Sequence, residues 1–425
     1  MFLMKRRGFT LIELLVVIAI VGILSGLVFV SMSGAIDAAR DAKIKSDMGS
    51  IVKAVTIYST LNNNEYPDSL ADLVPTYLGS VPLDPNGSSY VYADLGTGFT
   101  LSGTLSTGAA YSYSTSNGWA TGIAGYSHYK VITLTNSGSV LTNYPIQITL
   151  YKAAGQGASG TTNCEGLCDD NFSDVAFTDS TGNTGLPFWL ETASIAGSGT
   201  TLHATFWINI PTIATGSSTQ IRMYYDSDSP TLASNGDNTF DFFDNFNETS
   251  TSDPAFTAKW DMLNVPANIA VSGGTCVITG NASAPVLKGK TVFATNYAIR
   301  FRHAPSAIGG ANIQAGWYDT SKYLIIYGSA TPGQSSYTCC NSSEVRHYWT
   351  GDTSYHVFDI IRNGSTNTLC YKDNGYMFTD SAQVPTVDMK PTFVNATAGT
   401  TETIDWVLIR KYVSTEPTAA FGAQN

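Results

Sequence analysis

A single carboxylate, Glu13, stands inside an apolar segment that covers residues 9–30. A charged side chain in a membrane interior is costly, so such a residue is a functional candidate whose expected partner is a cation. The segment holds 22 residues, which as a helix would extend about 33 Å and could cross a bilayer. Basic residues at positions 5–7 precede it, so the positive-inside bias keeps the N-terminus in the cytoplasm and sends the rest of the chain outward.

The sequence RGFTLIE at residues 7–13 closely resembles the cleavage and methylation motif of type IV prepilins and type II secretion pseudopilins. The resemblance implies that a prepilin peptidase cuts between Gly8 and Phe9, and that Phe9 becomes the N-methylated first residue of the mature subunit. It also implies that Glu13 pairs with the terminal amine of a neighbouring subunit during assembly. The alternatives are a plain membrane anchor and a secretory signal peptide, whose apolar core would be about 7–15 residues long. Neither accounts for Glu13.

An apolar stripe continues the helix beyond the membrane segment. Its members are spaced by 4, 3, 4 and 3 residues, which is the period of one helix face, so we expect a helix over residues 9–61. Residues 66–92 resemble the tyrosine-proline and aspartate-proline-x-glycine loop of the major pseudopilin group. Short alternating stretches up to residue 113 indicate a small antiparallel sheet against the helix. The stripe consists of Ile44, Met48, Ile51, Val55 and Tyr58.

The chain changes character after residue 126, where apolar and polar residues alternate with a period of two and predict half-buried antiparallel strands. Residues 126–238 resemble a bacterial domain of unknown function that often precedes a laminin-G-like module. The residues that follow fit a concanavalin-like jelly roll, with two Asn-Gly sequences at expected hairpin turns. The expected fold is therefore α+β and multi-domain: a long N-terminal pilin helix with a small antiparallel sheet, then two all-β domains, a β-sandwich and a concanavalin-like jelly roll. The expected limits are 1–8 for a prepilin leader, 9–122 for a pilin or pseudopilin domain, 126–238 for the β-sandwich, 239–413 for the jelly roll and 414–425 for a tail.

Six cysteines follow the predicted membrane segment, and an even number in an exported region suggests disulfides. We expect Cys164 to pair with Cys168, because both stand in one short loop. Adjacent cysteines rarely bond to each other, so Cys339 and Cys340 are each expected to pair with one of the two others, at positions 276 and 370. A zinc site is the alternative, but no histidine has ligand spacing from a cysteine pair.

Aromatic side chains of the β-region are candidates for stacking on sugars. Trp207 falls on the polar face of its expected strand, and Trp349 belongs to a group of aromatic residues in the jelly roll. The alternative is that these side chains belong to the core. Related sandwiches use acids of the first and last strands to hold a structural calcium ion, which would make Asp244 and Asp405 its ligands. No other cofactor is expected.

Catalysis has little support in the sequence. Glycosidases of the jelly-roll type that retain configuration need two carboxylates about 5–5.5 Å apart, usually from a Glu-x-Asp-x-x-Glu strand. This pattern is absent, and the five histidines are scattered. We therefore expect a protein that is not an enzyme.

Charge is sparse throughout the chain. Lys and Arg number 22 and Asp and Glu 33, so the net charge is −11, and charged residues make up 13% of the chain. An average soluble domain has about 25%. Because nucleic-acid binding depends on clustered basic residues, no nucleic-acid partner is expected.

These features together predict a pilin-like structural subunit of a type IV pilus-type surface filament that displays lectin-like β-domains for adhesion or glycan binding. The expected partners are other pilin subunits, the prepilin peptidase, the membrane through the N-terminal helix, and a carbohydrate ligand. The precursor would lie in the inner membrane with its C-terminal region outside, and the assembled subunit on the cell surface. The alternatives are a pseudopilin of a type II secretion system and a surface-anchored carbohydrate-active enzyme.

Overall fold

The N-terminal region is built on one uninterrupted helix, α1 (Leu11–Leu61). The computed structural model describes residues 11–425, with side chains from residue 36 onward, apart from a few short segments. The segments outside the described residues are 97, 106–109, 116–117, 123–125, 127, 156, 158–159, 181, 183, 217, 228–229, 231, 309–311, 329–332 and 425.

The predicted stripe on α1 is the contact surface for a small sheet. Ile44, Met48, Ile51 and Val55 are each no more than 2% exposed, and they share a core with Phe99 of the sheet. The sheet is antiparallel with the order β1-β2-β3-β4, and a short 3-10 helix, η1 (Leu70–Leu73), packs beside it. This arrangement confirms the expected helix and small antiparallel sheet. The strands are β1 (Val91–Asp94), β2 (Phe99–Thr104), β3 (Ala110–Ser114) and β4 (Gly118–Gly122).

No helix among the residues whose side chains are described is both long and apolar enough to cross a membrane. The side chains of the predicted span, residues 9–30, lie outside that set.

The first β-domain, here called the first sandwich, consists of two four-stranded sheets with the orders β7-β6-β10-β9 and β27-β5-β11-β8. All pairings are antiparallel except the short pair β6–β7. Alternating residues such as Ile146, Ile148 and Leu150 face the core between the sheets. The strands are β5 (His128–Thr135), β6 (Leu141–Tyr151), β7 (Thr161–Asn163), β8 (Ala176–Asp179), β9 (Phe188–Ala196), β10 (His203–Ile213), β11 (Ser218–Tyr225) and β27 (Thr418–Gln424), with η2 (Gly199–Thr201) before β10.

The jelly roll also consists of two antiparallel sheets. The eight-stranded sheet has the order β14-β15-β26-β17-β22-β23-β24 with β12 paired to β26, and the seven-stranded sheet has the order β13-β16-β25-β18-β19-β20-β21. Large side chains such as Trp317, Tyr337 and Phe393 fill the space between them. The two all-β domains thus confirm the expected fold class.

The elements of the jelly roll follow the chain in this order: α2 (Gly236–Thr239), β12 (Phe242–Asp244), α3 (Pro254–Lys259), β13 (Trp260–Leu263), η3 (Pro266–Asn268), β14 (Ile269–Ser272), β15 (Thr275–Thr279), β16 (Val286–Gly289), β17 (Tyr297–Pro305), β18 (Ile313–Tyr318), β19 (Tyr323–Gly328), β20 (Gln334–Cys340), β21 (Glu344–Thr350), β22 (His356–Asn363), β23 (Asn367–Lys372), β24 (Gly375–Asp380), β25 (Lys390–Asn395) and β26 (Thr401–Lys411).

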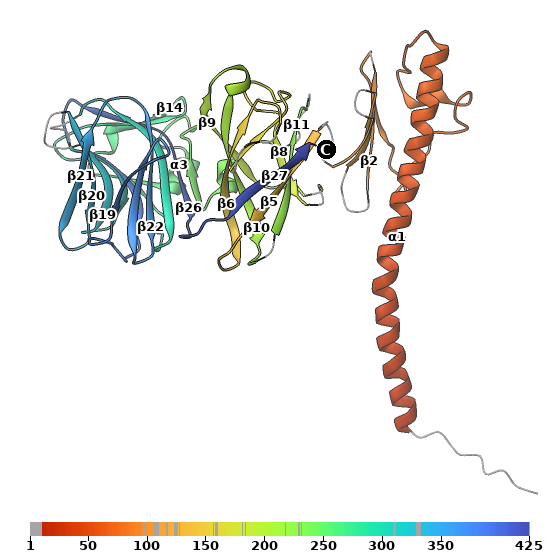
Figure 1. Ribbon diagram of the computed structural model, residues 1–425, viewed down its shortest axis with the longest axis horizontal. Helices are drawn as coiled ribbons and strands as arrows, with labels where there is room; N and C mark the ends of the chain where they lie inside the picture. Colours follow the sequence, from red (N-terminus) through yellow and green to blue (C-terminus); the bar gives the residue numbers. More distant parts are fainter. Residues whose placement is uncertain are drawn as a thin grey trace, which may run out of the picture.

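The C-terminal segment differs from the expected tail. After β26 the chain leaves the jelly roll and returns to the first sandwich, where β27 adds an edge strand beside β5 (Figure 1). Phe421 and Ala419 of β27 pack against the core of the first sandwich. Sequence reasoning did not identify this strand because the alternation in TAAFGAQ is weak and its partner strand lies almost 300 residues earlier. The first and last strands of the β-region are therefore paired in one sheet.

Candidate functional site

The two β-domains meet through an aromatic cluster, here called the junction cluster. Trp189 on β9 lies edge-on to Phe243 and Trp406 of the jelly roll, with ring centres 5.1 and 5.2 Å apart. Aromatic pairs at such distances contribute about 0.5–1.5 kcal/mol each beyond the burial of their area. The contact is therefore a packed core rather than a loose encounter of two surfaces. The full cluster consists of Trp189, Trp207, Phe240, Phe243, Trp406 and Leu408, all less than 10% exposed.

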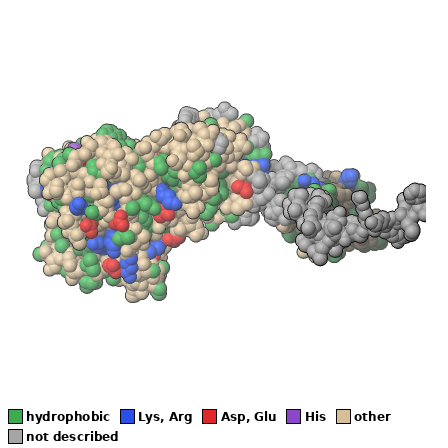
Figure 2. All heavy atoms as spheres, turned by 90° about the horizontal axis from the view of Figure 1, so that it is seen from below, with side chains coloured by type: hydrophobic (Ala, Val, Ile, Leu, Met, Phe, Trp, Pro, Cys, Tyr) green, Lys and Arg blue, Asp and Glu red, His purple; other side chains and the backbone are tan. Residues whose placement is uncertain are grey.

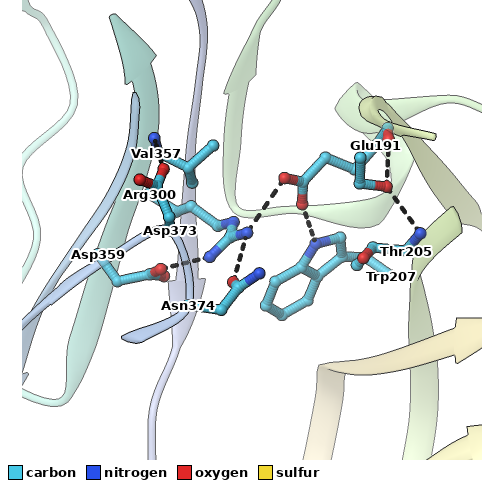
Figure 3. Close-up of polar contacts among 9 residues, drawn as sticks. Glu191, Thr205, Trp207, Arg300, Val357, Asp359, Asp373 and Asn374 are labelled. Carbon is cyan, nitrogen blue, oxygen red and sulfur yellow. Dashed lines mark hydrogen bonds and ion pairs between the residues drawn. The ribbon is translucent and has the colours of Figure 1, made fainter. Parts of the chain in front are cut away.

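A buried ion network lies beside this cluster, with Arg300 of β17 at its centre (Figure 3). One guanidinium nitrogen donates to Asp359 of the jelly roll. The other donates to Glu191 of the first sandwich at 3.1 Å and to the side-chain oxygen of Asn374 at 2.9 Å. Side-chain exposure is 3% for Arg300 and 2% for Glu191, so this ion pair between the domains is shielded from water.

Electrostatics keep the Arg300 side chain charged. Burial alone would lower the pKa of its guanidinium, but Asp359 and Glu191 more than offset that effect and raise the pKa above its ordinary value. The second oxygen of Glu191 accepts the indole N–H of Trp207 at 3.2 Å. The carboxylate thus has partners on both sides of the junction.

A second set of contacts fastens the chain where it returns to the first sandwich. Arg410, at the end of β26, pairs with Glu416 at 2.5 Å, and Glu416 accepts the hydroxyl of Tyr144 of the first sandwich at 2.8 Å. The guanidinium of Arg410 also lies 5.1 Å from the ring centre of Trp207. Lys411 donates to the carbonyl oxygen of Thr142 at 2.9 Å. These contacts tie the segment before β27 to both domains.

Trp207 belongs to this junction and not to a sugar-binding surface. It is 2% exposed, and both its N–H and its ring contact other side chains. The strand face that looks polar in sequence is the face that packs against the jelly roll. The structure therefore corrects the hypothesis that sugars stack on Trp207.

Trp349 lies on β21 and is half-buried. It lines a hollow of about 460 Å³ at one end of the jelly roll, together with Asp352, His356 and Lys372. His356 is paired with Asp352 at 2.8 Å, so polar groups stand beside the indole ring. Trp349 remains a candidate for stacking on a ligand.

The two acids expected to bind calcium have separate partners. Asp244 accepts the indole N–H of Trp260 at 2.6 Å and the backbone N–H of Phe246 at 2.8 Å, and burial raises the pKa of Asp244 to about 6. Asp405 pairs with Arg302. Within the part of the chain that is described, no group of three or more His, Cys, Asp or Glu residues is placed to hold a metal ion. The arrangement does not support the calcium hypothesis.

Cys164 and Cys168 form a disulfide with their Cα atoms 5.9 Å apart. The other four cysteines are free, which corrects the expected pairings of Cys339 and Cys340. Neighbours on one strand point to opposite faces of the sheet. Cys339 therefore faces the core, whereas Cys340 lies on the outer face and cannot reach the buried cysteines at positions 276 and 370.

The residues with predicted roles in processing and assembly are only partly covered. Gly8 and Phe9 lie outside the described residues. Glu13 belongs to helix α1, but its side chain is not among those described. Their roles remain predictions.

Comparison with known proteins gives the N-terminal region an identity. Residues 3–29 match the model of the prokaryotic N-terminal methylation motif. The type II secretion system core protein G of Escherichia coli is 36% identical over 109 residues, which cover 22% of this chain and 74% of that protein. The chain belongs to the type II secretion system core protein G family. The core protein G of Pseudomonas aeruginosa is 38% identical over 114 residues and is covered to 80%. Membership in the core protein G family establishes a pilin-like subunit with a prepilin-type motif.

The β-region has a separate match. Residues 171–263 match a domain of unknown function (DUF2341). The match extends from the first sandwich to the end of β13, past the limit of 238 expected from the sequence. It therefore includes Glu191 and four of the six residues of the junction cluster.

The solved structures that resemble part of this chain include two glucanases. A β-1,3-glucanase from Mycobacterium marinum covers 40% of the chain and 98% of its own length at 15% identity, with a TM-score of 0.33. A β-glucanase from Bacillus licheniformis covers 40% of the chain and 97% of its own length at 12% identity, with a TM-score of 0.34. At these identities the likeness concerns the fold alone.

Proposed function

We propose that this member of the core protein G family is a filament subunit that carries a rigid pair of β-domains outward for adhesion. The observation that carries the proposal is the join between a prepilin-type helix and two sandwiches fastened by a buried interdomain ion pair. In Figure 1 the helix stands at one end of the molecule and the jelly roll at the other. A ligand held at the jelly roll would therefore be kept away from the filament axis.

The proposed assembly route begins at the inner membrane. The precursor would be a single-pass protein with its β-domains outside, and the prepilin peptidase would cut between Gly8 and Phe9. The methylated amine of Phe9 would then pair with Glu13 of a neighbouring subunit, which satisfies a carboxylate that has no water around it. Assembled filaments would display the subunit at the cell surface.

Mass spectrometry of the native N-terminus and a Glu13 variant test this route. We expect a peptide that begins at N-methylated Phe9. Glu13→Leu should leave the subunit in the membrane and out of filaments, whereas the control Thr10→Val, in the same segment, should assemble normally. A native N-terminus beyond residue 30, or normal assembly of Glu13→Leu, would contradict the proposal.

A second candidate function is a pseudopilin of a type II secretion system. The likeness to type II secretion system core proteins G favours it, because the matched region corresponds to most of their length. Two large sandwiches on every subunit would crowd a filament, so we favour a minor or tip position in either machine. Gold labelling with an antibody to the β-region separates the cases: labelled filament ends support the tip, and continuous labelling indicates a major subunit. Loss of protein secretion without loss of pili, after deletion of the gene, would favour the pseudopilin.

We further propose that the β-region is not catalytic. The β-region has no Glu-x-Asp-x-x-Glu sequence, which is the usual source of the paired carboxylates in retaining jelly-roll glycosidases. Incubation of the purified subunit with β-glucans should release no reducing ends. Measurable release would restore the alternative of a surface-anchored carbohydrate-active enzyme.

A further inference from the structure

A large hollow lies where the first sandwich meets the jelly roll, and we call it the junction cleft. Its walls come from β9 and the segment before α2 on one side, and from α3, the β14–β15 turn and β26 on the other. It encloses about 1460 Å³, including its open mouth. Typical ligand pockets enclose about 300–1,000 Å³ and occur preferentially at domain interfaces. The junction cleft therefore has room for a ligand of several rings.

The floor of the junction cleft is aromatic. Trp189 of the first sandwich and Phe243 and Trp406 of the jelly roll line it, and all three belong to the junction cluster. Their edge-on packing holds each ring in a fixed orientation. These rings are only 3–7% exposed, so a ligand in the cleft touches their exposed edges, and the part of it that lies there must be apolar.

The rim of the junction cleft is rich in hydrogen-bond acceptors. It carries four acids and one base, so its net charge is 1 − 4 = −3. One carboxylate oxygen of Glu248 is buried and has no hydrogen-bond partner among the described residues. A buried acceptor without a partner is unfavourable, so this oxygen is suited to a donor brought by a ligand. The rim residues are Asp237, Glu248, Asp253, Asp405 and Lys259, joined by the amides of Asn235, Asn245 and Asn247.

We propose that the junction cleft binds a neutral oligosaccharide, an inference that rests on the proposed adhesive function and names its ligand class. A sugar ring has apolar C–H groups that can lie against the exposed edges of the indole and phenyl rings, and hydroxyl groups that can donate to carboxylates and amides. The negative rim disfavours phosphorylated or sulfated ligands. The volume exceeds what a single ion requires, and the aromatic floor offers an ion no ligands.

Both domains contribute to the junction cleft, so it exists only while they are held together. Trp189 and Thr192 stand on the first sandwich, whereas Ala255 and Trp406 stand on the jelly roll. The Arg300–Glu191 pair fixes the spacing of these walls. A binding role therefore gives a reason for a rigid junction in a chain that otherwise contains few charges.

Blocking the junction cleft from either wall tests the proposal. Ala255→Trp on α3 and Thr192→Trp on β9 place a large ring in the cleft, and both positions are exposed, so neither change disturbs a core. The control is Ala258→Trp, an exposed position of the same helix that does not line the cleft. Full-length processed subunit in detergent would be applied to an array of neutral glucan, galactan and mannan oligosaccharides. The best-retained member would then be titrated by calorimetry.

We expect the wild type and Ala258→Trp to bind equally, and the two blocking variants to bind at least tenfold more weakly. Equal binding by all four proteins would place the ligand elsewhere and overturn the proposal. Retention of none of these oligosaccharides by the wild type, or retention of cationic peptides instead, would overturn it as well. Gold labelling of filaments made with each variant tests the filament role separately from sugar binding in the junction cleft. Wild-type subunits that assemble but bind no sugar refute the cleft alone, and subunits that bind sugar but never enter filaments refute only the filament role.

Discussion

Removing the Arg300 guanidinium should uncouple the two sandwiches. Arg300→Met keeps most of the side-chain volume but leaves two carboxylates, Asp359 and Glu191, buried without the cation that they share. Breaking a buried pair by removal of one partner costs about 3–5 kcal/mol, because the remaining charge is uncompensated. Whole domains are stable by only about 5–15 kcal/mol. The loss is therefore a large part of what holds the β-region together.

Arg302 provides the matched control on the same strand. It pairs with Asp405, but both side chains are about a quarter exposed, at 27% and 26%. Exposed and partly exposed pairs contribute about 0–1 kcal/mol. Arg302→Met should thus lower the free energy of unfolding by about 1 kcal/mol or less, even though it removes an arginine two residues away.

Differential scanning calorimetry and urea unfolding of the mature subunit would measure both effects. We expect one shared transition for the two sandwiches in the wild type and in Arg302→Met, and two separate transitions in Arg300→Met. The double variant Arg300→Met/Glu191→Gln should recover part of the loss, because it removes one of the stranded charges and keeps an acceptor for Trp207. Equal destabilisation by the two single variants, or a shared transition in Arg300→Met, would refute the reasoning.

Two further predictions concern the jelly roll and the C-terminal strand. Burial raises the pKa of Asp244 from its ordinary 3.8 to about 6, so the folded state keeps a proton that the unfolded state loses between these values. Stability should therefore fall by up to about 3 kcal/mol as the pH rises through that window. Asp244→Asn removes the charge but turns an amide nitrogen toward one of the two N–H donors that Asp244 binds. Its free energy of unfolding relative to wild type, measured in urea, should therefore be more favourable at pH 7 than at pH 4, and a difference independent of pH would contradict this. Deletion of residues 418–425 removes the side chain of Phe421 from the first sandwich, keeps Glu416 with its partners Arg410 and Tyr144, and should lower that domain's stability by about 2 kcal/mol or more in calorimetry. An unchanged melting temperature would show that β27 adds nothing to the sheet.

The sequence predicted those helices and strands that can be recognised from the spacing of neighbouring apolar residues. The stripe of Ile44, Met48, Ile51 and Val55 has helical spacing, and those side chains are buried against the small sheet. Period-two alternation likewise predicted strands of the first sandwich, and two Asn-Gly turns predicted hairpins of the jelly roll. Such patterns report which face of an element is buried, and they do not report what covers it. The polar face of β10 looked exposed for this reason, although it carries Trp207 into the junction.

The sequence indicated the junction between the two sandwiches only indirectly. Arg300, Asp359 and Arg410 each stand directly beside large apolar residues of their strands, in a chain where charge is rare. Such residues are seldom fully buried unless they are paired, so their positions could have suggested partners. The identity of the partners depends on how two separate domains dock. Glu191 lies 109 residues from Arg300, and nothing in local spacing relates the two.

The distribution of charge also bears on how force would pass through the molecule. Figure 2 shows that the face seen from below is mostly uncharged, with charged side chains gathered mainly over the jelly roll. At the junction, buried charges join the domains, and the chain crosses between them twice, from β11 to α2 and from β26 to β27. The small sheet on α1 connects to the first sandwich only once, between β4 and β5. A pull on a ligand in the proposed junction cleft would therefore load both sandwiches together, because the two chain crossings and the Arg300–Glu191 pair hold them to each other.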